Sequence, residues 1–163
     1  MLIDAHHHAI PPLWREALER AGADKSGGAE LPAWSPASAL AALDGAGVNA
    51  AVLSISEPGV FHGDAGAAVD LARRCNDALA ELVREHPRRF GALAVLPLPD
   101  VDASLDELDR TAREDAFDGV VLLANYGGRY LGDPDRKAAD RVMQAMLKMQ
   151  KIVIADLDRA YAG

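Results

Sequence analysis

Two histidines near the start of the chain, His6 and His8, have the spacing with the clearest chemical consequence. If residues 2–7 form a strand, side chains alternate between its faces, so Asp4, His6 and His8 share one face. Two imidazoles on one face can converge on a single ion, and neutral imidazole is a good ligand for zinc, manganese or ferrous iron. Asp4 would then orient one ring by accepting its second N–H. The sequence predicts a divalent metal site with His6 and His8 as ligands, and zinc is the ion we expect.

The elements that must position these rings alternate along the chain between short apolar runs and amphipathic stretches. After the first strand, the apolar runs at 49–55, 90–96 and 120–124 are typical of strands buried on both faces. Between them the spacing predicts helices over 11–21, 37–46, 65–85 and 104–114, the last beginning with the outline of a capping box, Ser104 to Glu107.

Four strands separated by helices indicate repeated βαβ units and a parallel sheet with right-handed crossovers. An eight-unit barrel needs about 250 residues. The 163 residues of this chain therefore leave two architectures open, an open doubly wound sheet and an incomplete (β/α) barrel.

The loops that follow two of the predicted strands supply weaker candidates for substrate contact. In both architectures, function lies at the carboxyl ends of the parallel strands. An arginine beside the Gly127-Gly128 pair suits carboxylate binding, although turn chemistry explains the glycines equally well. His62 lies on the loop after the second predicted strand, and a solvated loop histidine is the alternative interpretation of this residue. The predicted substrate contacts are His62, Asn125, Tyr126 and Arg129.

Composition and charge exclude several classes of partner. Half of the residues are hydrophobic and a quarter are charged, as in a soluble globular protein. A net charge of −8 argues against nucleic acid or an anionic membrane as a partner. No apolar run approaches the roughly 20 residues of a membrane span. The single cysteine, Cys75, lies on the apolar side of a predicted helix, and we expect a buried small hydrophobe in a cytoplasmic protein.

The segment Ile3-Asp4-x-His6-x-His8-x-x-Pro11-Pro12 resembles the first strand of the amidohydrolase superfamily. The likeness is greatest to the amidohydrolase-related branch that includes aminocarboxymuconate-semialdehyde decarboxylase. Further similar pieces follow in order at 54–60, 72–77, 86–91, 96–100, 118–120 and 130–134, so the resemblance covers about residues 1–134. It implies the N-terminal half of a metal-dependent (β/α)₈ barrel, about four βα units. In that family the metal is held by the paired histidines of strand 1, by one or two histidines of strands 5 and 6, and by an aspartate of strand 8.

Residues 135–163 depart from this pattern and form the predicted helical tail, which we do not expect to be an independent domain. Apolar residues recur there at helical spacing, at Ala139, Val142, Met146 and Met149. The tail resembles the C-terminus of glyoxalase-fold, demethylubiquinone methyltransferase-like proteins. An ordinary divergent helix is the alternative.

The resemblance implies a metal-dependent hydrolase or decarboxylase acting on a small carboxylate-bearing substrate. His6 and His8 carry over as ligands, but strands 5 to 8 have no counterpart in this sequence, so we expect a truncated form that is inactive alone. A catalytic zinc has three protein ligands plus an open position, and only two are identified here, with no catalytic group assigned. The alternative is a non-catalytic half-barrel or interaction module whose open sheet is completed by dimerisation, giving a homo-oligomer.

Overall fold

The computed structural model of the chain describes residues 1–23, 25–26, 28–126 and 129–130. The chain divides into two units, residues 1–123 and 124–163. The strands of the first unit are β1 (Ile3–Ala9), β2 (Lys25–Ser26), β3 (Ala29–Glu30), β4 (Ala50–Ile55), β5 (Phe90–Val95) and β6 (Phe117–Val121). Its helices are α1 (Pro12–Arg20), α2 (Pro36–Gly45), α3 (Ala65–Glu85) and α4 (Val101–Thr111). Of the second unit, the structure describes β7 (Asn125–Tyr126) and β8 (Arg129–Tyr130), which pair antiparallel.

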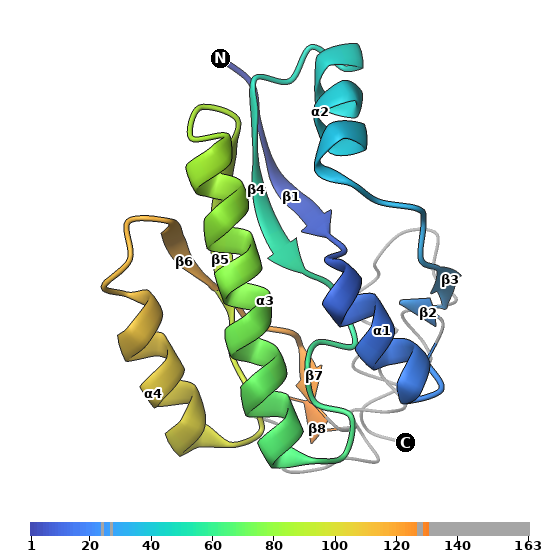
Figure 1. Cartoon of the computed structure of the whole chain (residues 1–163), viewed down its shortest axis with the longest axis vertical. Coiled ribbons are helices and arrows are strands. Elements are labelled where there is room, and N and C mark those ends of the chain that lie inside the picture. Colours follow the sequence, from blue (N-terminus) through green and yellow to red (C-terminus); the bar gives the residue numbers. More distant parts are fainter. Residues whose placement is uncertain (24, 27, 127–128, 131–163) are drawn as a thin grey trace, which may run out of the picture. The chain divides into compact units, whose positions relative to one another are not determined.

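The main sheet has the strand order β1-β4-β5-β6, and every neighbouring pair is parallel. Each of these strands therefore lies beside the one that follows it, as in a barrel, whereas a doubly wound sheet reverses its strand order near the middle. Helices α3 and α4 lie over one face of the sheet (Figure 1). The predicted four βα units are confirmed, and of the two architectures left open by the sequence the fold is the partial barrel.

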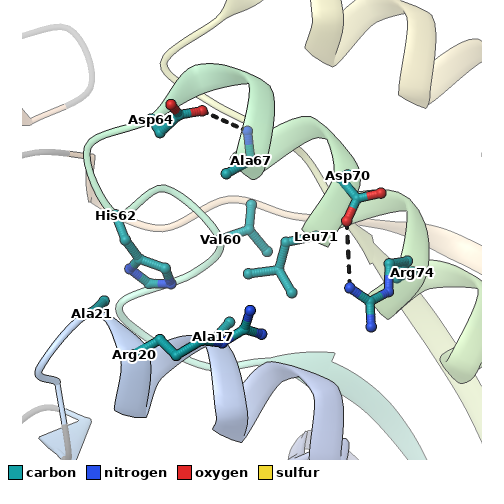
Figure 2. A pocket seen from close by; sticks show the side chains of 10 residues that line it. All are labelled: Ala17, Arg20, Ala21, Val60, His62, Asp64, Ala67, Asp70, Leu71 and Arg74. Carbon is teal, nitrogen blue, oxygen red and sulfur yellow. Dashed lines mark hydrogen bonds and ion pairs between the residues drawn. The ribbon is translucent and has the colours of Figure 1, made fainter.

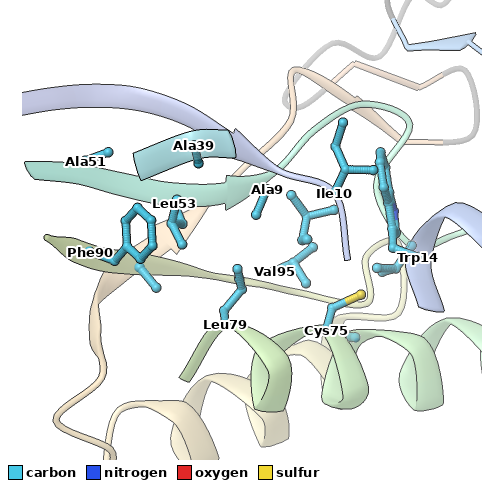
Figure 3. Close-up of a cluster of buried hydrophobic side chains, with 14 of the residues drawn as sticks. Ala9, Ile10, Trp14, Ala39, Ala51, Leu53, Cys75, Leu79, Phe90 and Val95 are labelled. Carbon is cyan, nitrogen blue, oxygen red and sulfur yellow. The ribbon is translucent and has the colours of Figure 1, made fainter. Parts of the chain in front are cut away.

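The core lies between the sheet and α3, the longest helix (Figure 3). From the strands it takes Leu53, Ile55 and Phe90, and from the helix Cys75 and Leu79. This is the apolar face that helical spacing predicted for residues 65–85. Cys75 is fully buried, as predicted, and burial raises the pKa of its thiol to about 12. Burial favours the uncharged thiol, so Cys75 acts as a small core hydrophobe.

Helix α4 and strand β6 each begin about three residues earlier than the sequence predicted. Helix α4 begins at Val101 instead of at 104, because the carboxylate of Asp100 accepts the backbone N–H of Ala103 at 3.0 Å and caps the helix. The Ser104 hydroxyl donates to the Asp100 carbonyl and forms no capping box. Strand β6 spans Phe117–Val121 instead of the predicted 120–124, and the side chain of Phe117 packs against the core.

Helix α4 buries polar side chains and exposes apolar ones. Its buried residues are Ser104, Glu107 and Thr111, while Leu105 and Leu108 are exposed. The carboxylate of Glu107 accepts from Asn76 Nδ2 at 2.7 Å. A polar network therefore joins α4 to α3, in place of the usual apolar seam.

The same network reaches the end of β5 through both atoms of the Asn76 amide. Asn76 Nδ2 donates to the Val95 carbonyl at 3.0 Å, and its Oδ1 accepts the Val95 N–H at 2.9 Å. Asn76 is fully buried, so these bonds replace the hydration that its amide loses. Within the described residues, no helix has the length and apolarity needed to cross a membrane.

Candidate metal site

A β-bulge in β1 decides where the histidines point. Asp4 pairs with Ala51 of β4, but His7 already pairs with Leu53, so two residues of β1 stand opposite one residue of β4. Such a bulge interrupts the alternation of side chains between the two faces of a strand. The predicted single face shared by Asp4, His6 and His8 was wrong for this reason.

Asp4 bonds a different histidine from the two predicted ligands. Its Oδ2 lies 3.0 Å from Nδ1 of His7, and its Oδ1 accepts the backbone N–H of His6 at 3.1 Å. These two hydrogen bonds, the His7 bond first, lower the pKa of the Asp4 carboxyl. Asp4 therefore ties the bulge to the ring of His7, and its predicted role behind a metal-bound ring stays a prediction.

The rings of His6 and His8 do meet. Their centroids are 4.7 Å apart, with the ring planes at 77°. The ring of His8 is positioned from β4, because its Nδ1 and the Oγ of Ser54 share a hydrogen bond of 3.1 Å. A histidine that binds a metal through Nε2 needs a hydrogen-bond partner for its Nδ1–H, and the Oγ of Ser54 is placed to accept that hydrogen bond from His8.

The two rings lie on the face of the sheet opposite α3. Leu53 and Ile55 of β4 pack in the core under that helix, so Ser54, which lies between them, points to the other face. His8 bonds Ser54 and shares that side. In a closed barrel this face is the interior, and the carboxyl ends of the strands carry the active site.

Burial lowers the pKa of His8, and the neighbouring His6 adds to this effect. A lowered pKa favours the neutral imidazole, which is the form that binds a metal. Two adjacent imidazoles, one held by a hydrogen bond to its far nitrogen, fit the role of two metal ligands. Across the described ranges, no group of three or more His, Cys, Asp and Glu side chains is placed to hold a metal.

The other predicted contacts lie on other elements of the chain than this pair. His62 lies on the loop between β4 and α3 and lines a groove between α1 and α3. Asn125 and Tyr126 form β7 in the second unit, where Tyr126 is buried and Arg129 begins β8. The side chain of Arg129 lies outside the described residues, and the roles of these four residues stay predictions.

Sequence reasoning missed Ser54 and His7. Ser54 left a signal, since it is a hydroxyl in an otherwise apolar strand, where an unpartnered polar group is costly. His7 left none, because a strand without a bulge would have placed it away from Asp4.

Comparison with known proteins identifies the chain's relatives. The family model described as "Amidohydrolase" matches residues 3–156, which extends past the boundary at 134 that the sequence predicted. The likeness of residues 135–163 to glyoxalase-fold proteins stays a prediction.

Among curated proteins, the decarboxylase yanB of Aspergillus niger is 40% identical over 136 residues, covering 80% of this chain and 37% of the relative. The 6-methylsalicylic acid decarboxylase acuB of Aspergillus aculeatus is 38% identical over 136 residues, covering 81% of this chain and 41% of its own length. The chain thus spans about two fifths of the length of these relatives.

Solved structures give the same relationship. A crystal structure of an amidohydrolase II protein superposes with a TM-score of 0.77 at 28% identity, covering 89% of this chain and 48% of that one. The 5-carboxyvanillate decarboxylase of Novosphingobium aromaticivorans, in complex with manganese and 4-hydroxy-3-methoxy-5-nitrobenzoic acid, has a TM-score of 0.61 at 26% identity. That match covers 80% of this chain and 43% of the decarboxylase.

Proposed function

This chain belongs to the amidohydrolase family, and from that premise we propose that His6 and His8 hold a divalent metal ion in the active site of a carboxy-lyase. The observation that carries the proposal is the contact of the two rings, at 4.7 Å between centroids, on the face of the sheet opposite α3. The carboxyl end of β1 is the position at which a barrel of this kind places its catalytic groups.

We propose decarboxylation in preference to hydrolysis because of the curated relatives. Both are decarboxylases, and one acts on 6-methylsalicylic acid. The manganese-containing neighbour binds a substituted nitrobenzoic acid. The substrate class that follows is a small aromatic carboxylate, with manganese as the first ion to test and zinc as the second.

When bound, the metal would supply a Lewis acid that polarises an oxygen of the substrate. The chain's own residues would do the rest of the positioning. Ser54 holds the His8 ring through Nδ1, which would leave Nε2 available to bind the metal. Asp4 fixes the bulge between β1 and β4 through the N–H of His6, so the spacing of the rings is built into the backbone.

Metal binding tests this proposal directly. We expect the full chain, stripped with EDTA and titrated with Mn²⁺ or Zn²⁺, to bind one ion per chain by calorimetry. The double variant His6→Ala/His8→Ala should lose this binding. His86→Ala is the matched control, because His86 packs edge-on against Phe90 at the far end of α3. Equal affinity of wild type and double variant would contradict the proposal.

Turnover is measured separately, as CO₂ released from 6-methylsalicylate in the presence of Mn²⁺. Release by the wild type that EDTA abolishes, and that the double variant does not show, would support this activity for the chain by itself. No release would agree with the expectation from the sequence that the chain is inactive alone. Release that survives EDTA would count against a metal-dependent decarboxylase.

A second candidate is assembly of two copies through the open sheet. β1 and β6 are the outer strands of the sheet as described, and Leu2, Ile3 and Leu122 beside them are exposed. Exposed strand edges invite pairing with another chain. Sedimentation would show a dimer that Ile3→Lys disrupts, and a wild-type monomer would rule this candidate out.

A further inference from the structure

A groove of about 290 Å³ lies between α1 and α3, on the helix-covered side of the sheet (Figure 2). Its floor is apolar and includes Val60 and Leu71, and two small residues, Ala17 and Ala67, leave room between the helices. The volume is close to the lower end of the range for small-molecule pockets. The groove is separate from His6 and His8, whose rings lie on the opposite face.

The walls of the groove are held together by a buried hydrogen bond. Trp14 of α1 donates its Nε1–H to the carbonyl of Gly59 at 2.7 Å, and this loop residue precedes the groove-lining Val60. Gly59 has φ +75°, a backbone conformation that favours glycine. Both residues are buried, so the groove is largely formed before any ligand enters.

His62 brings an unsatisfied nitrogen to this groove. Its Nε2 is buried and has no hydrogen-bond partner within the described part of the chain. Figure 2 shows the ring turned toward α1. Burial lowers the pKa of His62, so the ring is favoured in its neutral form, with one N–H to donate. A buried polar atom without a partner calls for an explanation, and a ligand or a bound molecule in the groove is one.

Two guanidinium groups have donors to spare in the same groove. The Nε of Arg20 donates to the Glu16 carbonyl at 3.1 Å, and the rest of the fork points into the groove (Figure 2). Arg74 meets Asp70 at 3.4 Å in an exposed pair, which is a weak contact that a better acceptor can replace.

The acidic residues of the groove are already engaged. The carboxylate of Asp64 caps α3 by accepting the N–H of Ala67 at 2.7 Å, and Asp70 pairs with Arg74. Each of these carboxylates thus already has a partner, whereas Nε2 of His62 has none within the described residues. Planar guanidinium forks match a carboxylate in particular.

We propose that this groove binds a small organic carboxylate with an apolar body. The carboxylate lies against Arg20 and Arg74, the body packs on Val60 and Leu71, and Nε2 of His62 donates to the same molecule. The site is independent of the proposed carboxy-lyase site and needs no metal.

Benzoate is the probe, and benzamide is its neutral match in shape. Both are titrated by calorimetry into the EDTA-stripped full chain carrying His6→Ala/His8→Ala, so the metal site cannot contribute. We expect benzoate to bind at least tenfold more tightly than benzamide. Arg20→Ala and His62→Phe should each weaken benzoate binding at least tenfold. Arg84→Ala, which removes an exposed arginine of α3 that does not line the groove, should not.

His62→Phe also separates a ligand role from a packing role. It keeps a ring in place and removes the orphaned nitrogen, so the unliganded protein should melt no lower than wild type. Benzoate should shift the ¹⁵N resonance of the His62 ring in the parent protein. Unchanged benzoate affinity in both Arg20→Ala and His62→Phe would overturn the proposal, as would equal binding of benzamide. The tested variant lacks both proposed metal ligands, so a failure of benzoate to bind it says nothing against the proposed carboxy-lyase site.

Discussion

Replacing Glu107 is the perturbation whose cost follows most directly from the structure. Its carboxylate is 1% exposed and accepts from Asn76 Nδ2 at 2.7 Å. Arg110 reaches both of its oxygens, with Nε at 2.9 Å and Nη2 at 2.8 Å. The pKa of Arg110 is raised chiefly by this hydrogen bonding to Glu107. Glu107→Ala removes the acceptor for all three bonds at once.

The magnitude depends on which partners can recover water. Removing one member of a buried ion pair costs about 3–5 kcal/mol. Arg110 is 34% exposed and can be rehydrated, whereas Asn76 is fully buried and cannot. We therefore expect the lower end of that range, about 3 kcal/mol of unfolding free energy. For a chain of this size that lowers Tm by about 6–12 °C.

Urea unfolding of the full chain, followed by circular dichroism, measures this loss. Glu107→Gln keeps the size of the side chain and one acceptor oxygen, so we expect it to lose about half as much unfolding free energy. This variant provides the measurement if the alanine variant does not fold. Asp109→Ala is the matched control on the same helix, because its ion pair with Arg113 is exposed and is worth at most about 1 kcal/mol. If Glu107→Ala cost no more than Asp109→Ala, the reasoning on the buried network would be refuted.

Three further predictions concern other parts of the first unit. Leu105→Glu, on the exposed apolar side of α4, should change the unfolding free energy by less than about 0.5 kcal/mol in urea, and a larger loss would mean that this side is covered. Burial raises the pKa of Cys75 from 9.0 to about 12, so the unfolded chain ionises first and stability falls as pH rises from 9 to 12. Between pH 8 and pH 10, wild type should lose about 1.4 kcal/mol more than Cys75→Ala, and equal losses would contradict the burial argument. Ser54→Ala should weaken Mn²⁺ binding about 10–100-fold by calorimetry, with His86→Ala as control, and unchanged affinity would show that Ser54 does not orient His8.

Much of the fold could be predicted from local patterns. The longest helix, α3, spans the predicted residues 65–85, because its apolar positions recur at 3.6-residue spacing and determine which side is buried. The strands of the main sheet were found as short apolar runs, with boundaries off by a few residues. The start of α4 was misplaced because two residues, Asp100 and Ser104, could each cap a helix, and the choice depends on backbone geometry.

The candidate metal site was also predictable only in part from the sequence. The spacing of His6 and His8 is a property of the chain, and the rings do meet on one side of the sheet. The partner of Asp4 depended on a bulge against β4, which no local pattern of residues 2–9 reveals.

The sequence by itself determined the order of the elements, the apolar faces and the chemistry available in the histidine pair. These follow from residue type and from periodicity within one element. Only the tertiary structure decided which strand supports His8, which acid reaches which ring, and that Arg20 and Arg74 share a groove with His62. Those contacts join residues from different elements, and their distances are set by strand register and helix packing, which depend on the whole core.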